Sequence, residues 1–198
     1  MALSGIEPHP SPRAYLEQYT IPPEAAAEIL YIATYIYDDV VGRTIADLGC
    51  GTGRLGIGAV LLGAREAIGV DVDKVAVRVA QKNAAKMGVK GKTQWVIGEI
   101  DAVQGLFDTV IMNPPFGTRI KHMDRSFLSK AMATARVVYS LHKRATRQYL
   151  QRFIGSKHGS VEALFQMELK IQRVFDFHIK REHVVEVDLY RILSARKG

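Results

Sequence analysis

Short apolar runs alternate with helical patterns along most of the chain, and this alternation constrains the fold more than any other feature. Strand-like runs are expected at 44–48, 67–71, 93–97, 107–112 and 137–141. Two longer segments with strand alternation, 162–172 and 183–193, follow, with 176–181 as the turn that joins them into a hairpin. Alternating β-α units of this kind predict an α/β domain of three layers. We expect seven strands in one mostly parallel sheet, closed by a C-terminal antiparallel hairpin, with helices on both faces.

The segments between these runs have the composition of helices. The first opens at Pro22 and Pro23, because proline fits the first helical turn, and continues to Ala33. The others are expected at 54–63, 74–87, 126–135 and 146–154. Residues 1–13 hold three prolines and are expected to form an irregular arm, so that 1–198 is one domain with its catalytic part at 14–193.

The composition is that of an ordinary globular protein. The chain has 198 residues, of which 47% are hydrophobic and 24% charged, with a mean hydropathy of −0.00. No apolar run approaches the roughly 20 residues that span a bilayer, and the first residues lack the basic and apolar regions of a signal peptide. Cys50 is the single cysteine, which excludes an intramolecular disulfide. The cytoplasm is the expected location.

Positive charge is concentrated near the C-terminus. Residues 1–118 hold 10 Lys and Arg against 13 Asp and Glu, whereas residues 119–198 hold 17 against 7. The net charge of +7 therefore arises entirely in the last two-fifths of the chain. Such clustering is typical of a surface that contacts phosphates, although a merely solvated basic face has the same composition.

A glycine-rich turn joins the first strand to its helix. The run Asp47-Leu48-Gly49-Cys50-Gly51-Thr52-Gly53 allows a tight turn and a close approach of the backbone to a ligand. Asp71 ends the next strand, 20 residues after Gly51, where a carboxylate accepts hydrogen bonds from the hydroxyls of a ribose.

The residues 51–56 also satisfy the G-x-G-x-x-G fingerprint of dinucleotide-binding proteins. Asp47 argues against that interpretation, because an acid before the turn repels a pyrophosphate but suits the ammonium group of an amino-acid-bearing cofactor. S-adenosylmethionine is therefore favoured over NAD(P) and over a purely structural loop.

The fourth strand ends in Asn113-Pro114-Pro115-Phe116. Two prolines stiffen this turn and fix the direction of the preceding carbonyl groups. The Asn113 side-chain oxygen and the Pro114 carbonyl suit the two hydrogens of an exocyclic amine, and Phe116 offers a face for a flipped base. A tight turn with a buried Phe is the alternative. The motif predicts methylation of a planar amine.

These motifs resemble class I S-adenosylmethionine-dependent methyltransferases, which have a Rossmann-like fold. More narrowly, the chain resembles the small archaeal and eukaryotic enzymes that methylate N6 of an adenosine in small-subunit ribosomal RNA, the methyltransferase-like protein 5 family. The resemblance covers about residues 14–193 and depends on segments in the same order and at the same spacing, namely 16–19, 37–39, 47–51, 110–118, 138–143 and 185–189.

The resemblance implies a role for individual residues. Gln18 and Thr20 would close over the methionine end of the cofactor, and Gly49, Cys50 and Gly51 would line it by their backbone. The remaining cofactor-binding residues would be Asp47, Asp71 for the ribose, Val72 against the adenine, Glu99 for the adenine amino group (with Asp101 as a competitor) and Asn113.

In the eukaryotic relatives, a small zinc-binding activator protein pairs with the edge of the sheet. The candidate edge here is 93–97, which contains Trp95. A tryptophan in such a strand is also explained by ordinary packing.

Basic residues near the motif are candidates for RNA contact, although each also fits an ordinary solvated surface. They are Arg119, Lys121, Arg125, Lys143, Arg144, Lys180 and Arg181. The six histidines show no metal-binding spacing, so no metal is expected.

The sequence thus predicts an enzyme that methylates N6 of adenosine in RNA, with Asn113, Pro114, Pro115 and Phe116 as catalytic residues. N2-guanine methylation of RNA and glutamine methylation of a protein are the alternatives within the enzyme class. A noncatalytic RNA-binding protein is the alternative outside it. A DNA adenine methyltransferase is disfavoured, because the chain leaves no room for a separate target-recognition domain.

Overall fold

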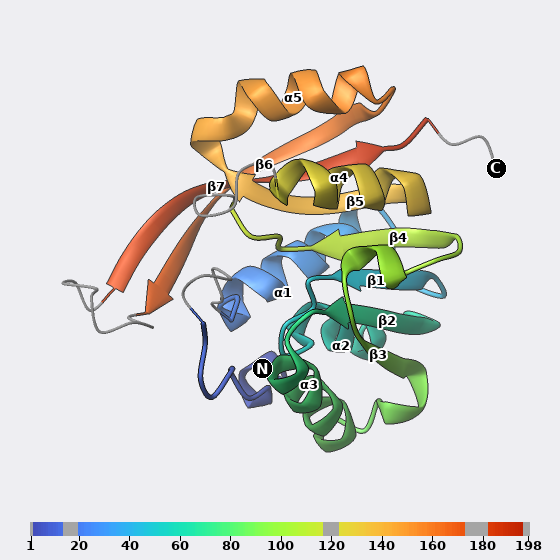
Figure 1. Cartoon of the computed structure of the whole chain (residues 1–198), viewed down its shortest axis with the longest axis vertical. Helices are drawn as coiled ribbons and strands as arrows, with labels where there is room; N and C mark the ends of the chain where they lie inside the picture. The colour runs from blue at the N-terminus through green and yellow to red at the C-terminus, as the bar shows by residue number, and fades with distance from the viewer. Residues whose placement is uncertain (1, 14–19, 117–122, 173–181, 196–198) are drawn as a thin grey trace.

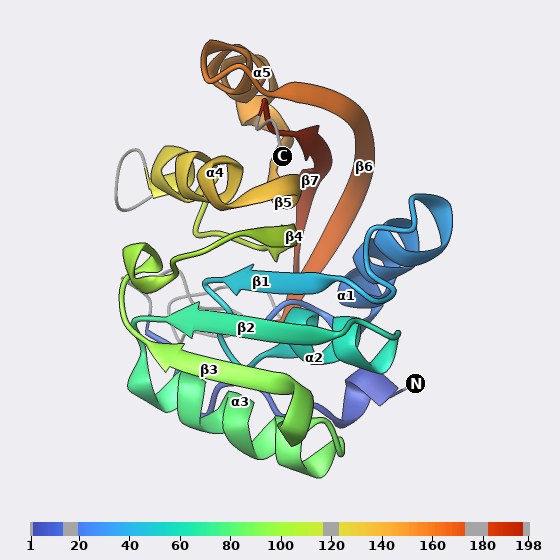
Figure 2. The ribbon, with the colours of Figure 1, turned by 90° about the vertical axis from the view of Figure 1, so that its right-hand side faces the viewer.

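The computed structural model describes residues 2–13, 20–116, 123–172 and 182–195, and the strands within these ranges form one sheet. In spatial order the strands are β3-β2-β1-β4-β5-β7-β6, as Figures 1 and 2 show. Strands β1 to β5 run parallel, and β7 is antiparallel to both β5 and β6. The strand bounds are Thr44–Leu48 (β1), Glu66–Asp71 (β2), Thr93–Ile97 (β3), Phe107–Met112 (β4), Ala135–Lys143 (β5), Ser160–Gln172 (β6) and Glu182–Leu193 (β7).

Helices cover both faces of this sheet (Figure 2). Helices α1 and α2 contribute to one buried apolar cluster, and α4 and α5 contribute to a second one on the other face. Helix α3 packs on β2 and β3. The α-helices are Pro23–Tyr31 (α1), Arg54–Leu61 (α2), Lys74–Lys86 (α3), Met123–Thr134 (α4) and Arg147–Ser156 (α5). A π-helix, Ile32–Ile36, continues α1, and 3-10 helices occupy Ala2–Gly5, Lys90–Lys92, Ile100–Ala102 and Arg144–Thr146.

The expected fold class and strand order along the chain are confirmed. The clearest difference is at α4, which begins at Met123 and is followed by β5 at Ala135 without a loop. Ala135 is already buried and pairs with Phe107, so the sheet extends β5 toward the helix beyond the expected start. The hairpin turn predicted at 176–181 lies outside the described residues.

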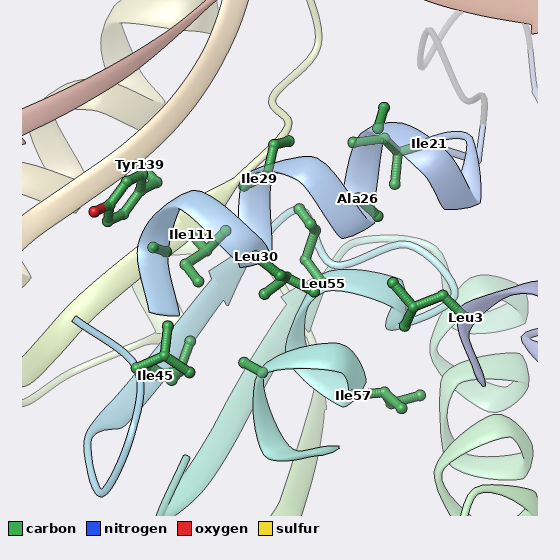
Figure 3. Packing of buried hydrophobic residues seen from close by; sticks show 14 of the residues in the cluster. Leu3, Ile21, Ala26, Ile29, Leu30, Ile45, Leu55, Ile57, Ile111 and Tyr139 are labelled. Carbon is green, nitrogen blue, oxygen red and sulfur yellow. The ribbon is translucent and has the colours of Figure 1, made fainter. Parts of the chain in front are cut away.

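The first buried cluster joins the α1–α2 pair to the sheet (Figure 3). Leu30 lies against α2 so closely that a Cβ added at Gly58 would meet its Cδ1 at 2.4 Å. At the far side of the cluster, the Tyr139 hydroxyl donates to the Asp39 carboxylate at 2.6 Å, and Arg191 donates to the same carboxylate at 2.8 Å. These hydrogen bonds attach the segment after α1, which contains Asp39, to strands β5 and β7.

The irregular N-terminal arm is docked on the domain. Leu3 and Ile6 are buried in the first cluster. The Asn83 amide of α3 donates to the Glu7 carbonyl and accepts from the Glu7 N–H. The buried Arg54 of α2 donates to the carbonyls of Ile6 and Ile21. The arm therefore belongs to the packed structure, which its proline content did not predict.

Among the described residues, no helix combines the length and the apolarity needed to span a membrane.

Leu30→Ala is expected to lower the free energy of unfolding by about 2–5 kcal/mol, because it leaves a cavity between α1 and α2. Leu61→Ala is the matched control, since Leu61 is 39% exposed, and its cost is expected to stay below about 1 kcal/mol. Urea denaturation of both variants measures the difference. Equal destabilisation would contradict the packing described here.

Candidate active site

The carboxyl ends of β1, β2 and β4 open into one cavity of about 510 Å³. Strand β1 continues through α2 to β2 on one side, and its neighbour β4 continues through α4 to β5 on the other, so the connections leave these adjacent strand ends in opposite directions. Ligands of open α/β sheets bind in such a crevice. The sequence-predicted residues that line the cavity are Thr20, Asp47, Gly49, Cys50, Gly51, Asp71, Val72, Glu99, Asn113, Pro114 and Pro115.

The glycine turn is fastened to the end of β2. The N–H groups of Gly49 and Cys50 donate to the Val70 carbonyl at 2.9 and 3.0 Å, and the Gly51 N–H donates to Asp71 Oδ2 at 2.9 Å. Gly53 has φ +82°, and a Cβ there would lie 2.6 Å from the Trp95 ring. A side chain at Gly53 is therefore excluded by both backbone and packing. Trp95 has the packing role that was the alternative to a partner contact.

Asp71 is oriented by two backbone groups. Its Oδ2 accepts from Gly51, and its Oδ1 accepts from the Asp73 N–H at 2.9 Å. Burial raises its pKa, and these two hydrogen bonds partly oppose the rise. Each carboxylate oxygen keeps a second lone pair, so the group is suited to accept two hydroxyl hydrogens from the cavity.

Asp47 is the more deeply buried acid, with 1% of its surface exposed. Its Oδ2 accepts from the Gly56 N–H at 2.9 Å. Burial raises its pKa from 3.8 to about 7, the Gly56 hydrogen bond opposes this, and the charge of Asp71 adds to it. With Glu99 and Asp101 also in the lining, the cavity is acidic and favours a cationic ligand.

The Asn-Pro-Pro-Phe turn reaches the cavity with its first three residues. Asn113, Pro114 and Pro115 line it, and Pro114 is buried. Phe116 is absent from the lining: its half-buried ring packs against the first core cluster, and the Lys143 Nζ lies 5.4 Å from the ring centroid. The structure thus separates the amine-binding positions from the proposed stacking residue.

Several lining residues were missed by sequence reasoning. Met123, Ser126 and Phe127 come from the first turns of α4, a helix whose start the sequence placed too late. His9 comes from the N-terminal arm. No local pattern marks these residues, because the distant segments that carry them meet only in the fold. Thr52 also lines the cavity, and it belongs to the glycine turn that the sequence did single out.

The predicted RNA-contacting residues separate into groups. Four of them lie outside the described residues, namely Arg119, Lys121, Lys180 and Arg181. The same is true of Gln18, which was predicted to bind the cofactor. Arg125 donates to the Tyr149 hydroxyl at 2.9 Å and lies over the Phe153 ring. Arg144 forms ion pairs with Glu186 at 2.8 Å and with the buried Asp188 at 3.5 Å. Its positive charge is therefore locally neutralised, unlike those of Arg125 and Lys143.

The lining fits the cofactor expected from the sequence. The cavity volume lies in the range of small-molecule sites. Thr52 Oγ1 is buried and has no hydrogen-bond partner within the described part of the chain, so the lining holds a polar atom that a ligand can satisfy. Among the described residues, no group of three or more His, Cys, Asp or Glu side chains is arranged to hold a metal ion.

Asp47→Asn is expected to stabilise the protein at pH 8. The folded-state pKa of about 7 lies above the ordinary value of 3.8, so the folded form binds more protons between these values and stability falls as pH rises. The neutral amide removes this dependence while its oxygen still accepts from Gly56. Thermal unfolding of both proteins at pH 5 and pH 8 measures the effect, with Asp101→Asn as the exposed control. A variant without any gain at pH 8 would contradict the assigned burial cost.

Comparisons with known proteins identify the family of the chain. The PrmA family, described as ribosomal protein L11 methyltransferase, matches residues 32–140, which include the glycine turn and the Asn-Pro-Pro-Phe motif. The rRNA N(6)-adenosine-methyltransferase Mettl5 of Drosophila melanogaster is 37% identical, over 96% of this chain and 92% of the relative. METTL5 of Danio rerio is 33% identical, over 96% and 94%.

Solved structures show the same fold. Protein PH1948 of Pyrococcus horikoshii, described as a candidate RNA methyltransferase, has a TM-score of 0.90 and 41% identity, covering 98% of this chain and 95% of that one. Magnesium protoporphyrin IX methyltransferase of Synechocystis, solved with bound S-adenosylmethionine, shares the fold at a TM-score of 0.69 and 16% identity, covering 87% and 79%.

The cavity, the acidic lining and these similarities agree on the cofactor, which is S-adenosylmethionine. Because the relatives match along almost their whole length at more than 30% identity, the chain belongs to the Mettl5 family of methyltransferases, and its residues 32–140 to the PrmA family.

Proposed function

We propose that this enzyme transfers a methyl group from S-adenosylmethionine to N6 of an adenosine in small-subunit ribosomal RNA. The relatives from Drosophila melanogaster and Danio rerio are rRNA N6-adenosine methyltransferases by name. The observation that carries the proposal is that Asn113 and Pro114 line the same cavity as Asp47 and Asp71. Amine-binding groups and cofactor-binding groups therefore face one space.

The cofactor would be held along this cavity by residues from three strand ends. Asp71 would accept from the ribose hydroxyls, with Val72 against the adenine and Glu99 or Asp101 at its amino group. Asp47, Thr20 and the backbone of Gly49–Gly51 would face the methionine part. Gln18 belongs to the same proposal by resemblance alone, since it lies outside the described residues.

Asn113 and Pro114 would prepare the amine for attack. The Asn113 Oδ1 and the Pro114 carbonyl would each accept one hydrogen of the exocyclic amino group, which directs the nitrogen lone pair away from the ring system. The cofactor supplies an electrophilic methyl group on a sulfonium. The amine lone pair would form the new C–N bond as the C–S bond breaks, and the electron pair of the broken C–S bond would stay on sulfur. Positioning accounts for much of the rate in such a transfer.

The departing proton needs no protein base. After transfer the amine is cationic and loses its proton to water. His142, the histidine nearest the motif in the described sequence, is buried, and burial lowers its pKa to about 3. Its Nε2 lies 2.6 Å from the Ser140 Oγ. It is thus a neutral residue that packs against the Tyr190 ring and not an acid–base group.

Phe116 is retained as the stacking residue for the flipped adenine. Lys143 lies over its ring at 5.4 Å, so an incoming base would take the other face or displace the ammonium group. Stacking of a base on an aromatic side chain contributes roughly 1–3 kcal/mol. The proximity of Lys143 to this ring also places a positive charge beside the entering nucleotide.

Arg125 and Lys143 are the described members of the proposed RNA surface. Within the described part of the chain neither forms an ion pair with a carboxylate. Arg125 lies in the first turn of α4, next to the cavity-lining Ser126. Their charges therefore remain to attract phosphates at the mouth of the cavity.

A protein substrate is the weaker alternative. In sequence, the ribosomal protein L11 methyltransferase of Thermotoga petrophila matches 46% of this chain, whereas the rRNA methyltransferase of Drosophila melanogaster matches 96% of it. The names of the relatives favour N6 of adenine over N2 of guanine, and the assay below distinguishes the two products.

An activator protein would pair with β3. This strand is at the edge of the sheet, and Val96 and Ile97 are 36% and 50% exposed on it. An unpaired strand edge with apolar side chains favours pairing with a strand of another chain. We propose this edge as the partner site.

We also propose that residues 14–193 act as one catalytic domain and that the protein is located in the cytoplasm.

Asn113→Ala is expected to lower methyl transfer at least 100-fold, because one of the two acceptors for the amine is lost. RNA affinity should stay within threefold. The measurement is labelled transfer to unmodified ribosomal RNA, followed by nucleoside digestion and mass spectrometry, with the exposed Gln104→Ala as control. N6-methyladenosine in the small-subunit RNA supports the function. N2-methylguanosine, or label only in protein, overturns it, and a near-normal rate for Asn113→Ala overturns the catalytic role.

The double variant Arg125→Gln/Lys143→Gln is expected to weaken RNA binding five- to twentyfold at 100 mM salt. Its plot of log affinity against log salt should be flatter, because RNA binding releases fewer counterions when the protein contacts fewer phosphates. Arg78→Gln/Lys82→Gln, which removes two exposed positive charges from α3, serves as the charge-matched control. An unchanged salt slope would remove both residues from the RNA surface.

A further inference from the structure

His9 brings the N-terminal arm into the cofactor cavity. Its side chain is only 6% exposed and forms part of the cavity lining. The backbone N–H of His9 donates to Thr20 Oγ1 at 3.2 Å, which joins the arm to another lining residue. A titratable side chain is thus enclosed next to the cofactor, and neither the family motifs nor the proposed mechanism assigns it a role.

The neighbours of the ring define its tautomer. The Ser11 N–H donates to His9 Nδ1 at 3.1 Å, so Nδ1 is an acceptor and carries no proton. Nε2 lies 3.2 Å from Asp73 Oδ2. A neutral imidazole with its proton on Nε2 satisfies both contacts, donating to the carboxylate while it accepts from the backbone.

Asp73 connects His9 to Asp71 through hydrogen bonds. Its Oδ1 accepts from the Val75 N–H at 2.8 Å and caps α3, while its own N–H donates to Asp71 Oδ1 at 2.9 Å. With its side chain 2% exposed, Asp73 has contacts on both sides that fix its backbone. The orientation of Asp71 therefore depends on how firmly Asp73 is held.

We propose that His9 is a positioning residue for the cofactor: by donating from Nε2 to Asp73, it holds the Asp73 N–H against Asp71 and so keeps the Asp71 carboxylate ready for the ribose. This inference rests on the ribose-binding role proposed for Asp71. It makes the docked arm part of the nucleoside end of the site. Loss of the His9 contact is expected to weaken every ligand that carries the ribose, whatever is attached at its 5′ carbon.

The test is calorimetric titration of the full-length protein without RNA. The ligands are S-adenosylhomocysteine, which has the amino-acid part, and 5′-methylthioadenosine, which lacks it. His9→Ala is expected to weaken both about tenfold, and by the same factor. His9→Gln should restore most of the affinity, because its amide also donates at a position close to Nε2. Lys86→Ala, which removes the exposed Lys86–Glu7 ion pair of the same arm, should leave both affinities unchanged.

Three results would overturn the proposal: unchanged affinity in His9→Ala, no recovery in His9→Gln, or a loss confined to S-adenosylhomocysteine. If His9→Ala does not fold, Asp73→Asn takes its place. Asparagine still caps α3 but presents a donor to Nε2, so it should reproduce the tenfold loss, and full affinity would contradict the relay.

Asp71→Ala distinguishes a failure of the His9 proposal from a failure of the ribose-binding role proposed for Asp71. If Asp71→Ala binds both ligands normally, the ribose role itself is wrong. If Asp71→Ala loses affinity and His9→Ala does not, only the relay is wrong. Neither outcome depends on whether the enzyme methylates adenosine.

Discussion

The attachment of the glycine turn to the end of β2 is the interaction on which the site depends. Gly49 and Cys50 donate to the Val70 carbonyl, and Gly51 donates to the Asp71 carboxylate. These bonds fix two neighbouring strand ends at once, so the turn and the acid at the end of β2 face the same space. The β4 turn with Asn113 joins them because β4 is the other neighbour of β1. A shift of one residue in the pairing of β1 with β2 would separate the turn from Asp71.

The acidic cavity carries a cost in stability that the function explains. Asp47 is almost fully buried, accepts from the Gly56 N–H and has a pKa raised to about 7. A hydrophobic residue of similar size would suit the free protein better, because burial penalises the charged carboxylate. In the proposed binding mode, a cofactor that carries a sulfonium and an ammonium group would offset this penalty. In the free protein the buried Asp47 carboxylate thus lacks a cationic partner, which the bound ligand would provide.

The positive surplus of the C-terminal part does not translate directly into a binding surface. Arg144 and Arg147 are directed at the buried Asp188, and Arg191 at Asp39. These arginines stabilise carboxylates that the sheet buries. Arg125 and Lys143 instead lie over the rings of Phe153 and Phe116, and within the described part of the chain neither pairs with a carboxylate. Counting charges along the sequence could not separate arginines that form structural ion pairs from cations that remain candidates for RNA contact.

The sequence by itself determined the elements and the chemistry of the strand ends. The alternation of apolar runs predicted the strands, and Asp47, Asp71 and Asn113 were chosen as site residues because each lies within the last two residues of a predicted strand or directly after it, where local spacing dictates position. The tertiary structure alone decided which distant segments share the cavity. His9 and the first turns of α4 line it, and Phe116 packs against the first core cluster beside it. Such contacts depend on how the arm docks through Asn83 and Arg54 and on how α4 packs, and long-range packing of this kind leaves no periodic signal in the sequence.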